Sequence, residues 1–377
     1  MPRSLLGSGQ VEQLGQWMEA NEAEVAFVDY QLSPVQQRNL ETAWGVKVVD
    51  RTGLILEIFA DRARTREGCL QVELASLNYQ LGRLVRSWTH LERQRGGHGF
   101  LGGPGERQIE LDRRMIRQSI QRLEIELAHV RRMRATQRGG RTRNAIQTVA
   151  LVGYTNAGKS TLFNRLCQSD VHAADQLFAT LDPTLRKLTL PNGLILMMSD
   201  TVGFVQDLPH ELVDAFRATL EEVMEADLII HVRDMADPES AMQKQVVEET
   251  LQQMGLHGDD IPVMIEVLNK CDLAPHIESR ICEGTHGSRL ALSALRGEGV
   301  DALLTLLQQW LQDAMQLCQL RIPLGDGKTL ALCHQHGVIV EQHYDEEALH
   351  LQVQLPARYA MQLADFMVDE SEVPPTD

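Results

Sequence analysis

The residues with the clearest chemical pattern lie between Gly153 and Ser160, in the sequence GYTNAGKS. This stretch matches G-x-x-x-x-G-K-[ST], in which glycines let backbone N–H groups surround a phosphate, Lys159 reaches the terminal phosphates and the Ser160 hydroxyl suits Mg²⁺. An ordinary tight turn is the alternative for so short a match. The predicted phosphate-binding residues are Gly153, Tyr154, Thr155, Asn156, Ala157, Gly158, Lys159 and Ser160.

Two further motifs would act on the γ-phosphate and Mg²⁺. The sequence from Asp200 to Gly203, DTVG, follows an apolar stretch, where an Asp can hold Mg²⁺ through water and a glycine N–H can meet the γ-phosphate. Upstream, both Thr180 and Thr184 could supply the hydroxyl of a nucleotide-sensing switch loop. The predicted residues are Phe178, Ala179, Thr180, Leu181, Asp182, Asp200, Thr201, Val202 and Gly203.

A fourth pattern, NKCD from Asn269 to Asp272, selects the base. The Asp272 carboxylate can accept hydrogen bonds from N1–H and the exocyclic amine of guanine, whereas adenine offers the wrong donors. Lys270 can lie over the base, Asn269 can brace the loops, and a backbone N–H near Ser293 and Ala294 should meet guanine O6. The predicted base-binding residues are Asn269, Lys270, Cys271, Asp272, Ser293, Ala294 and Leu295.

The residue after the DTVG motif is Phe204, where many nucleotide hydrolases carry a Gln that orients the attacking water. Phenylalanine cannot orient water by hydrogen bonding, so we expect slow intrinsic hydrolysis and a partner that completes the site. Asn156 is a candidate for holding K⁺ against the phosphates, and a purely bracing role is the alternative.

The elements that must position these motifs alternate between strand and helix, which predicts a doubly wound α/β sheet across residues 144–317. Because each motif follows a strand, the order of the motifs predicts a guanine-nucleotide domain. The expected strands of this domain are 148–152, 194–199, 227–232, 263–268 and 290–292, with a helix over 161–166.

The N-terminal part, residues 1–143, divides into a small α/β unit (1–65) and a helical hairpin (66–143). Ser33 and Pro34 predict the start of a helix over 36–43, between strands at 24–30 and 46–49. Residues 52–61 fit a helix or a strand. No catalytic group is visible in the α/β unit, so a scaffold or docking role is expected.

Apolar residues at alternating spacings of four and three, from Leu70 to Leu91 and from Ile116 to Val130, predict two packed antiparallel helices. The glycine-rich tip at 96–105 is a flexible linker or a loop that moulds to a partner. Residues 83–143 hold fifteen Arg and no Lys against six acidic residues, in a chain of net charge −16. This local excess indicates contact with a polyanion such as RNA, or arginines that pair within the hairpin. We expect a linker at 138–143.

The remaining residues, 318–377, predict a small α+β domain with strands at 329–333, 338–343 and 348–355, then a helix from Pro356. Cys333, His334 and His336 fit a polar hairpin turn better than a metal site, because no second ligand cluster follows. The six cysteines have no C-x-x-C spacing and no apolar run nears about 20 residues, so we expect a cytoplasmic protein without a membrane segment.

The assembled pattern resembles the HflX family of ribosome-associated GTPases, within the Obg–HflX group of P-loop GTPases. The resemblance rests on GYTNAGKS, residues 178–182, the sequence from Asp200 to Phe204 with Leu208-Pro209-His210, the hairpin tip GPGE with the following DRR, and REGCLQVEL at 66–74. This chain departs from the family at the tip, where Leu101-Gly102-Gly103 replaces an Arg-containing segment and Arg107 replaces a Thr.

The motifs make Ser160 an expected Mg²⁺ ligand and Lys159 and Gly203 expected catalytic residues of a GTP hydrolase that binds GTP and GDP, and we expect a monomer. The resemblance implies that Thr180 is the second metal ligand, and we count it among the catalytic residues. The resemblance also implies that the N-terminal hairpin contacts ribosomal RNA of the 50S subunit and that stalled ribosomes are split or rescued. The alternative is a regulatory GTPase that acts on a protein effector or assists RNA modification. Sedimentation with 50S particles discriminates between the two.

The carboxylate of Asp272 should decide which base is bound. In an Asp272→Asn variant the amide donates where guanine needs an acceptor, so GTP affinity should fall while xanthosine triphosphate affinity rises. A competition titration between the two nucleotides measures this change. Unaltered discrimination would refute the assignment.

Overall fold

The computed structural model describes residues 4–87, 104–143, 146–168, 178, 180–181, 184–206, 217–256, 263–274, 282–284, 287–313, 315–344 and 348–368. The chain forms two compact units. The first comprises Met1–Arg134, Ala174–Pro183 and Thr201–Glu222. The second comprises Ala135–Ala173, Thr184–Asp200 and Val223–Asp377. The predicted Ala179, Asp182 and Leu208–His210 lie outside the described residues.

The first unit begins with a small α/β arrangement in which two short parallel strands pair. Its elements are α1 (Ser8–Ala20), β1 (Val25–Val28), α2 (Pro34–Trp44), β2 (Lys47–Asp50) and α3 (Arg51–Arg62). The predicted start of α2 is confirmed: Ser33 Oγ accepts from Gln36 N at 3.3 Å, and Gln36 Oε1 accepts from Ser33 N at 2.9 Å. The ambiguous stretch 52–61 is helical.

One buried carboxylate, Asp50, fixes α3 and the helix that follows it. Asp50 caps α3 by accepting from Gly53 N at 2.9 Å, and it also accepts from Leu32 N at 3.1 Å. The Tyr79 hydroxyl and Arg83 Nη2 each donate to it at 2.6 Å. Because an anion at this depth needs all of these donors, strand β2 and helices α3 and α4 are held in one geometry.

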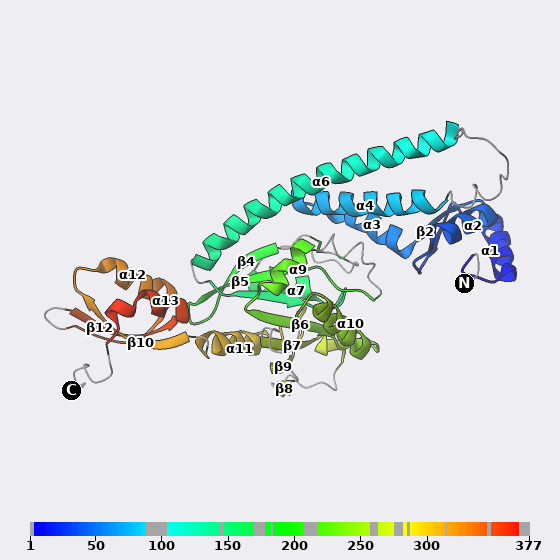
Figure 1. Cartoon of the computed structure of the whole chain (residues 1–377). Helices are drawn as coiled ribbons and strands as arrows, with labels where there is room; N and C mark the ends of the chain where they lie inside the picture. Colours follow the sequence, from blue (N-terminus) through cyan, green and yellow to red (C-terminus); the bar gives the residue numbers. More distant parts are fainter. Residues whose placement is uncertain are drawn as a thin grey trace. The chain divides into compact units, whose positions relative to one another are not determined.

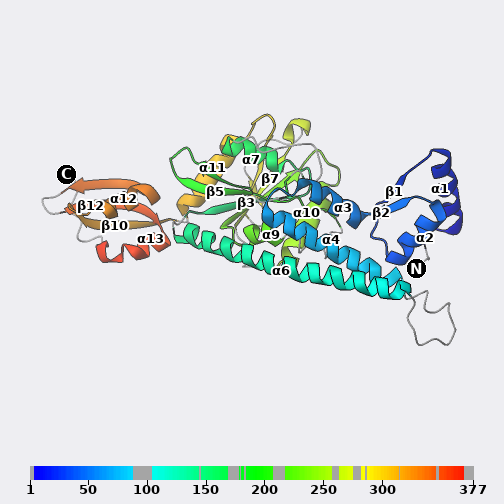
Figure 2. The same cartoon turned by 90° about the horizontal axis from the view of Figure 1, so that it is seen from above.

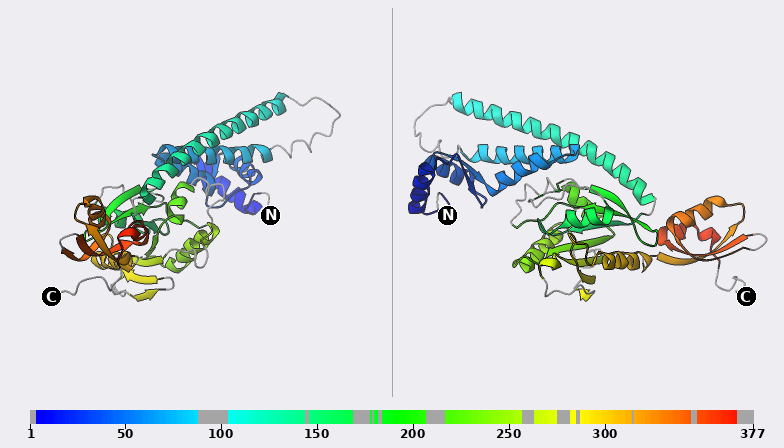
Figure 3. Two further views of the ribbon diagram at one scale, coloured as in Figure 1. Left: turned by 60° about the vertical axis from the view of Figure 1, so that its left-hand side comes forward. Right: turned by 180° about the vertical axis from the view of Figure 1, so that it is seen from behind.

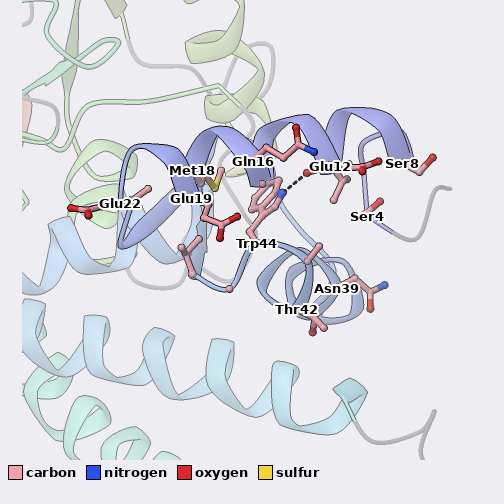
Figure 4. Close-up of a pocket in the computed structure, with 16 residues that line it drawn as sticks. Ser4, Ser8, Glu12, Gln16, Met18, Glu19, Glu22, Asn39, Thr42 and Trp44 are labelled. Carbon is pink, nitrogen blue, oxygen red and sulfur yellow. Dashed lines mark hydrogen bonds between the residues drawn. The ribbon is translucent and has the colours of Figure 1, made fainter.

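Helix α1 rests on α2 beside a hollow of about 840 Å³ (Figure 4). No residue of α1 is buried, and Trp44 Nε1 donates across the hollow to Val11 O at 2.9 Å. The polar residues around it include three carboxylates, Glu12, Glu19 and Glu22. The Trp44 indole therefore gives α1 a polar contact with α2.

Helices α4 (Arg66–Ser87) and α6 (Pro104–Arg143) form the predicted hairpin, and Figures 1 and 2 show them side by side. Leu70 packs with Leu123 and Leu127, and Arg66 Nη2 lies 2.9 Å from Glu126 Oε2. The start of α4 thus meets the later half of α6, which makes the pair antiparallel. The tip residues before Pro104, with Arg93, Arg95 and Phe100, lie outside the described residues.

The expectation of a linker at 138–143 is wrong, because α6 continues through Gly139 and Gly140 to Arg143. Each glycine costs a helix about 1 kcal/mol relative to alanine. A helix of 40 residues is already nucleated, so two adjacent glycines do not end it.

The second unit contains a seven-stranded sheet in the order β4-β5-β3-β6-β7-β9-β8, visible in Figure 1. Strands β3, β5, β6, β7 and β9 run parallel, and β4 and β8 pair antiparallel at the edges. The predicted strands are all present. They are β3 (Thr148–Val152), β5 (Ile195–Asp200), β6 (Leu228–Asp234), β7 (Val263–Asn269) and β9 (Gly287–Ala291). The edge strands β4 (Thr184–Thr189) and β8 (Cys282–Gly284) were not among the expected strands.

Helices α7 (Lys159–Cys167) and α11 (Val300–Asp313) cover one face of this sheet. Their apolar side chains form the main core with inward residues of the central strands, such as Leu151, Ile230 and Val267. Helix α10 (Ser240–Gln253) packs on the opposite face, and a short 3₁₀ turn, η3 (Cys271–Leu273), follows β7. Most of helix α9 (Arg217–Met224) belongs to the first unit.

The face under α10 carries a buried charge cluster centred on Glu266 of β7. Arg233 and Arg289 each lie 2.6 Å from its carboxylate, and Lys244 of α10 lies 3.2 Å away. Burial alone would raise the pKa of Glu266, but hydrogen bonds from the three cations outweigh it and lower the pKa to about 2. Neighbouring His231 is kept neutral because burial lowers its pKa to about 3.

The C-terminal residues form a three-stranded antiparallel sheet in the order β10-β12-β11, with helices α12 and α13 beside it (Figure 3). Inward side chains from β10 and β12, such as Cys318, Leu320 and Val353, make its core. The elements are β10 (Met315–Pro323), α12 (Gly327–His336), β11 (Val338–Tyr344), β12 (Ala348–Pro356), α13 (Ala357–Gln362) and η4 (Ala364–Phe366). The acidic tail lies outside the described residues.

The strand predicted at 329–333 is wrong, because these residues belong to helix α12. Asp326 caps this helix: its carboxylate accepts from Thr329 N at 3.2 Å and from Thr329 Oγ1 at 2.6 Å. Cys333, His334 and His336 therefore lie on a helix and not in a hairpin turn. In this C-terminal part, the strand that the sequence analysis missed is β10. Within the described ranges, no helix combines the length and apolar character needed to cross a membrane.

Removing the charge of Glu266 should destabilise the second unit. A Glu266→Gln variant removes the counter-charge of Arg233 and Arg289 and one of the two acidic partners of Lys244, so the free energy of unfolding at pH 7 should fall by about 3 kcal/mol. The folded pKa of Glu266 lies below its unfolded value. Its contribution is therefore complete above about pH 4.5 and lost as the pH falls toward about 2, so the two proteins should converge over that window.

Urea titrations of both proteins across this pH range provide the measurement. The control is Glu249→Gln, which removes the same charge from an exposed position on α10. Equal losses of stability in the two variants would show that the cluster contributes nothing specific.

Candidate nucleotide-binding site

The loop between β3 and α7 is shaped by two glycines that cannot be replaced. Gly153 has φ +153°, and a Cβ there would collide with the carbonyl oxygen of Val232 on β6. Gly158 has φ +94°, and a Cβ there would collide with the Asn269 amide. The loop backbone is thus drawn against the neighbouring strand and against the Asn269 side chain, as a close phosphate cradle requires.

Helix α7 begins at Lys159 and presents an anion-binding end. The N-cap of α7 is Gly158, which has no side chain to accept hydrogen bonds from the first N–H groups of the helix, so an anion can accept them. Lys159 is buried, and its Nζ donates to Gly153 O at 3.1 Å and to Tyr154 O at 2.9 Å. Burial lowers the pKa of Lys159 to about 8, against the opposing attraction of Asp200.

Ser160 and Asp200 meet beside the start of α7. Ser160 Oγ donates to Asp200 Oδ2 at 2.7 Å, and the Asp200 side chain at the end of β5 is completely buried. Register places Asp200 opposite Leu151 of β3. A hydroxyl and a carboxylate are hard oxygen donors, so this pair fits Mg²⁺, with the carboxylate able to act directly or through water.

The side chain of Asn269 joins the phosphate loop to the candidate base loop. Its Nδ2 donates to Ala157 O at 2.8 Å, and its Oδ1 accepts from Ala294 N at 2.9 Å. Only 2% of Asn269 is exposed. The bracing role expected for this residue has a direct geometric basis, and it uses the Ala294 N–H that the sequence analysis placed near guanine O6.

The remaining candidate base residues carry their own polar partners. Asp272 Oδ2 lies 3.5 Å from Arg296 Nε, and Lys270, at φ +62°, places its Nζ 2.7 Å from Asp234 Oδ2. The Ser293 hydroxyl accepts from Arg296 N at 3.1 Å. Burial raises the pKa of the Cys271 thiol, and nearby Glu298 and Asp272 add to that effect. Cys271 therefore serves here as packing and not as a nucleophile.

The described switch residues are buried within the first unit. Phe178, with φ +54°, packs edge-on against Phe59 of α3, with ring centroids 4.9 Å apart. After the DTVG motif, Gln206 O accepts from Arg51 Nη1 at 3.3 Å. The buried set also includes Thr180, Leu181, Thr201, Val202, Gly203 and Phe204. Thr184, the other hydroxyl considered for the switch, begins β4 in the second unit.

Sequence reasoning missed several residues around the site. Phe59 and Arg51 belong to a region expected to be a scaffold or a docking surface, and the apolar face of α3 was the one signal available for Phe59. Arg165, Asp234 and Arg296 contact the base-binding loops but belong to none of the motifs. Their contacts depend on which loops the fold brings together, so no local spacing indicates them.

Three family models match this sequence. Residues 148–270 match the family model described as "50S ribosome-binding GTPase". Residues 1–60 match "GTP-binding GTPase N-terminal", and residues 62–141 match "GTP-binding GTPase Middle Region". Together these models span most of the chain and include the phosphate loop, the DTVG motif and part of the base-binding sequence.

Several proteins that are similar to this chain over nearly its whole length share one name. A protein of Magnetococcus marinus named "GTPase HflX" is 52% identical over 94% of this chain and 82% of its own length. "GTPase HflX" of Escherichia coli is 44% identical over 94% of this chain and 83% of its own. The same name is borne by a protein of Lacrimispora saccharolytica that is 42% identical over 97% of this chain and 85% of its own. The chain belongs to the HflX family, and it is a guanine-nucleotide-binding GTP hydrolase with a P-loop α/β fold.

Proposed function

We propose that this GTPase acts as a monomer on the large ribosomal subunit, where GTP hydrolysis accompanies the splitting or rescue of stalled ribosomes. The observation that carries the proposal is the contact of α3 with both segments expected to sense the γ-phosphate. Phe59 touches Phe178 two residues before Thr180, and Arg51 binds the backbone of Gln206 three residues after Gly203. A conformational change in either switch segment must therefore alter its contact with α3.

Helix α3 leads directly into the basic hairpin. Only residues 63–65 separate it from α4, and the Asp50 carboxylate bonds the start of α3 and two side chains of α4. Exposed arginines on α6 can neutralise ribosomal RNA phosphates; they are Arg114, Arg117, Arg122 and Arg132. The family model over residues 148–270 supports the same partner, because its description names the 50S ribosome.

Within the nucleotide site, the residues divide the chemistry as follows. Ser160 and Thr180 would hold Mg²⁺, which neutralises charge on the β- and γ-phosphates. Lys159 stabilises the same phosphates, and the Gly203 N–H meets the γ-phosphate. Phe204 is buried and has no group that can orient water, so a partner has to complete the hydrolytic site. Asn156 is exposed at the loop, with φ +61°, and is the residue we propose for a K⁺ contact.

Lys159 has to exchange partners when a nucleotide binds. In the described structure its ammonium group is bonded to two loop carbonyls, and its lowered pKa reflects the low polarity around it. A phosphate brought next to it stabilises the charged form and raises the pKa again. The nucleotide therefore supplies negative charge beyond that of Asp200.

Nucleotide affinity should consequently depend on pH. Since the pKa of Lys159 is about 8 in the described structure and higher beside phosphate, GDP affinity should be constant below that pH and fall up to tenfold for each unit above it. Calorimetric titrations in buffers of different ionisation enthalpy should show proton uptake on GDP binding near pH 8. An affinity that does not change across this range, without proton uptake, would contradict the prediction.

The ribosomal role is tested by sedimentation with purified 50S particles. We expect salt-sensitive co-sedimentation with a non-hydrolysable GTP analogue, little with GDP, and strong stimulation of hydrolysis by 50S particles, higher in K⁺ than in Na⁺. A Phe59→Leu variant should keep nucleotide affinity but lose much of the difference between the two nucleotide states. Phe27→Leu, at an exposed aromatic position on β1, is the matched control.

Each result bears on a separate claim. Absence of 50S binding in either nucleotide state would favour the alternative of a protein effector or RNA-modification partner. Equal hydrolysis in K⁺ and Na⁺ would remove the role given to Asn156. Unchanged behaviour of Phe59→Leu would show that α3 does not report the nucleotide state.

A further inference from the structure

Helix α7 contacts the candidate base loop at the end opposite its phosphate-binding residues. Lys159 and Ser160 occupy its first turn, and Arg165 lies in its last turn. Arg165 Nε donates to Ala294 O at 2.7 Å, and its Nη2 donates to Leu295 O. The planar guanidinium group thus spans two successive carbonyls of the turn that follows β9, a geometry that an ammonium group cannot reproduce.

Almost all of the backbone N–H groups of that turn already donate hydrogen bonds within the protein. Within the described part of the chain, the Leu295 N–H is the one donor from Ser293 to Gly297 without a partner. The other four donate to Glu298 O (from Ser293), Asn269 Oδ1 (from Ala294), Ser293 Oγ (from Arg296) and Ser293 O (from Gly297).

The turn is shaped to receive the arginine. Gly297 has φ +90°, and a Cβ at this position would lie 3.0 Å from Arg165 Nη1. The absence of a side chain at Gly297 therefore leaves room for the guanidinium group beside the turn. Asn269 holds the same turn through the N–H of Ala294, so arginine and asparagine fix opposite sides of one peptide segment.

We propose that Arg165 is a positioning residue for guanine recognition, which holds the turn at Ala294 and Leu295 so that the Leu295 N–H meets guanine O6. The proposal rests on the base site proposed above, in which Asp272 binds the other edge of the guanine. Arg165 itself does not touch the nucleotide. It acts through the two carbonyls, because a free turn would have to be ordered each time a base bound.

The test compares Arg165→Met, which keeps the apolar stem but loses the donors, with Arg165→Lys, which keeps the charge and one point of donation. Lys187→Met, on the exposed side of β4, is the control for loss of a positive charge. Binding of GDP and of 6-thio-GDP, whose sulfur is a poor acceptor, is measured for each protein. Steady-state GTP hydrolysis gives KM and kcat separately.

Arg165→Met should weaken GDP binding about tenfold and raise KM by a similar factor while kcat is unchanged. Its preference for GDP over 6-thio-GDP should fall toward one, because the contact at position 6 is what the arginine supports. Arg165→Lys should lie between wild type and Arg165→Met, and Lys187→Met should match wild type. Unchanged GDP affinity, or an equal loss for GDP and 6-thio-GDP, would overturn the proposal.

A failure of the base site itself would look different. If Asp272→Asn does not shift preference toward xanthosine nucleotides, the assignment of the guanine pocket is wrong, whatever the Arg165 variants do. If that shift occurs while Arg165→Met keeps full discrimination at position 6, only the role of Arg165 is excluded. Urea unfolding of the nucleotide-free variants shows whether any affinity loss reflects a less stable protein.

Discussion

The nucleotide site depends on one buried amide. Asn269 donates to the carbonyl of Ala157 in the phosphate loop and accepts from the N–H of Ala294 in the base loop. With 2% of its surface exposed it cannot satisfy either group with water, so both bonds have to be kept. The distance between the loops is thereby set by the length of one side chain. The position of the Asn269 amide also requires a glycine at residue 158, since the amide occupies the space where a Cβ would lie.

The parts of this molecule that could be predicted from sequence are those governed by local chemistry. Every expected strand of the nucleotide domain was found, because apolar β-prone stretches there end directly at motifs whose residues need a strand terminus. The start of α2 was predictable for the same reason, as Ser33, Pro34 and Gln36 make their contacts within one turn. The two apolar seams of the hairpin likewise follow from helical periodicity alone.

The failures lie where a distant or competing interaction decided the outcome. Residues 138–143 look like a linker because glycine weakens a helix, but a long helix already formed carries them along. Residues 329–333 contain Leu330, Ala331 and Leu332, which favour a helix, and Asp326 caps the helix that they form. The contacts of Arg165, Phe59 and Arg51 join segments far apart in the sequence, so they leave no trace in local spacing.

The carboxylate of Asp50 has a mechanical consequence. It binds the first turn of α3 and also Tyr79 and Arg83 in the second half of α4, so these two helices have to turn together. Helix α4, with 22 residues, is about 33 Å long, and the part of α6 that packs along it has a similar length. A rigid arm of that length converts a small rotation at its base into a larger displacement of its end. If α3 pivots by about 5°, a point about 33 Å away moves by about 3 Å, roughly half a helical turn. A shift at Phe59 too small to break its own packing would therefore become a displacement large enough to make or lose contacts at the far end of the hairpin.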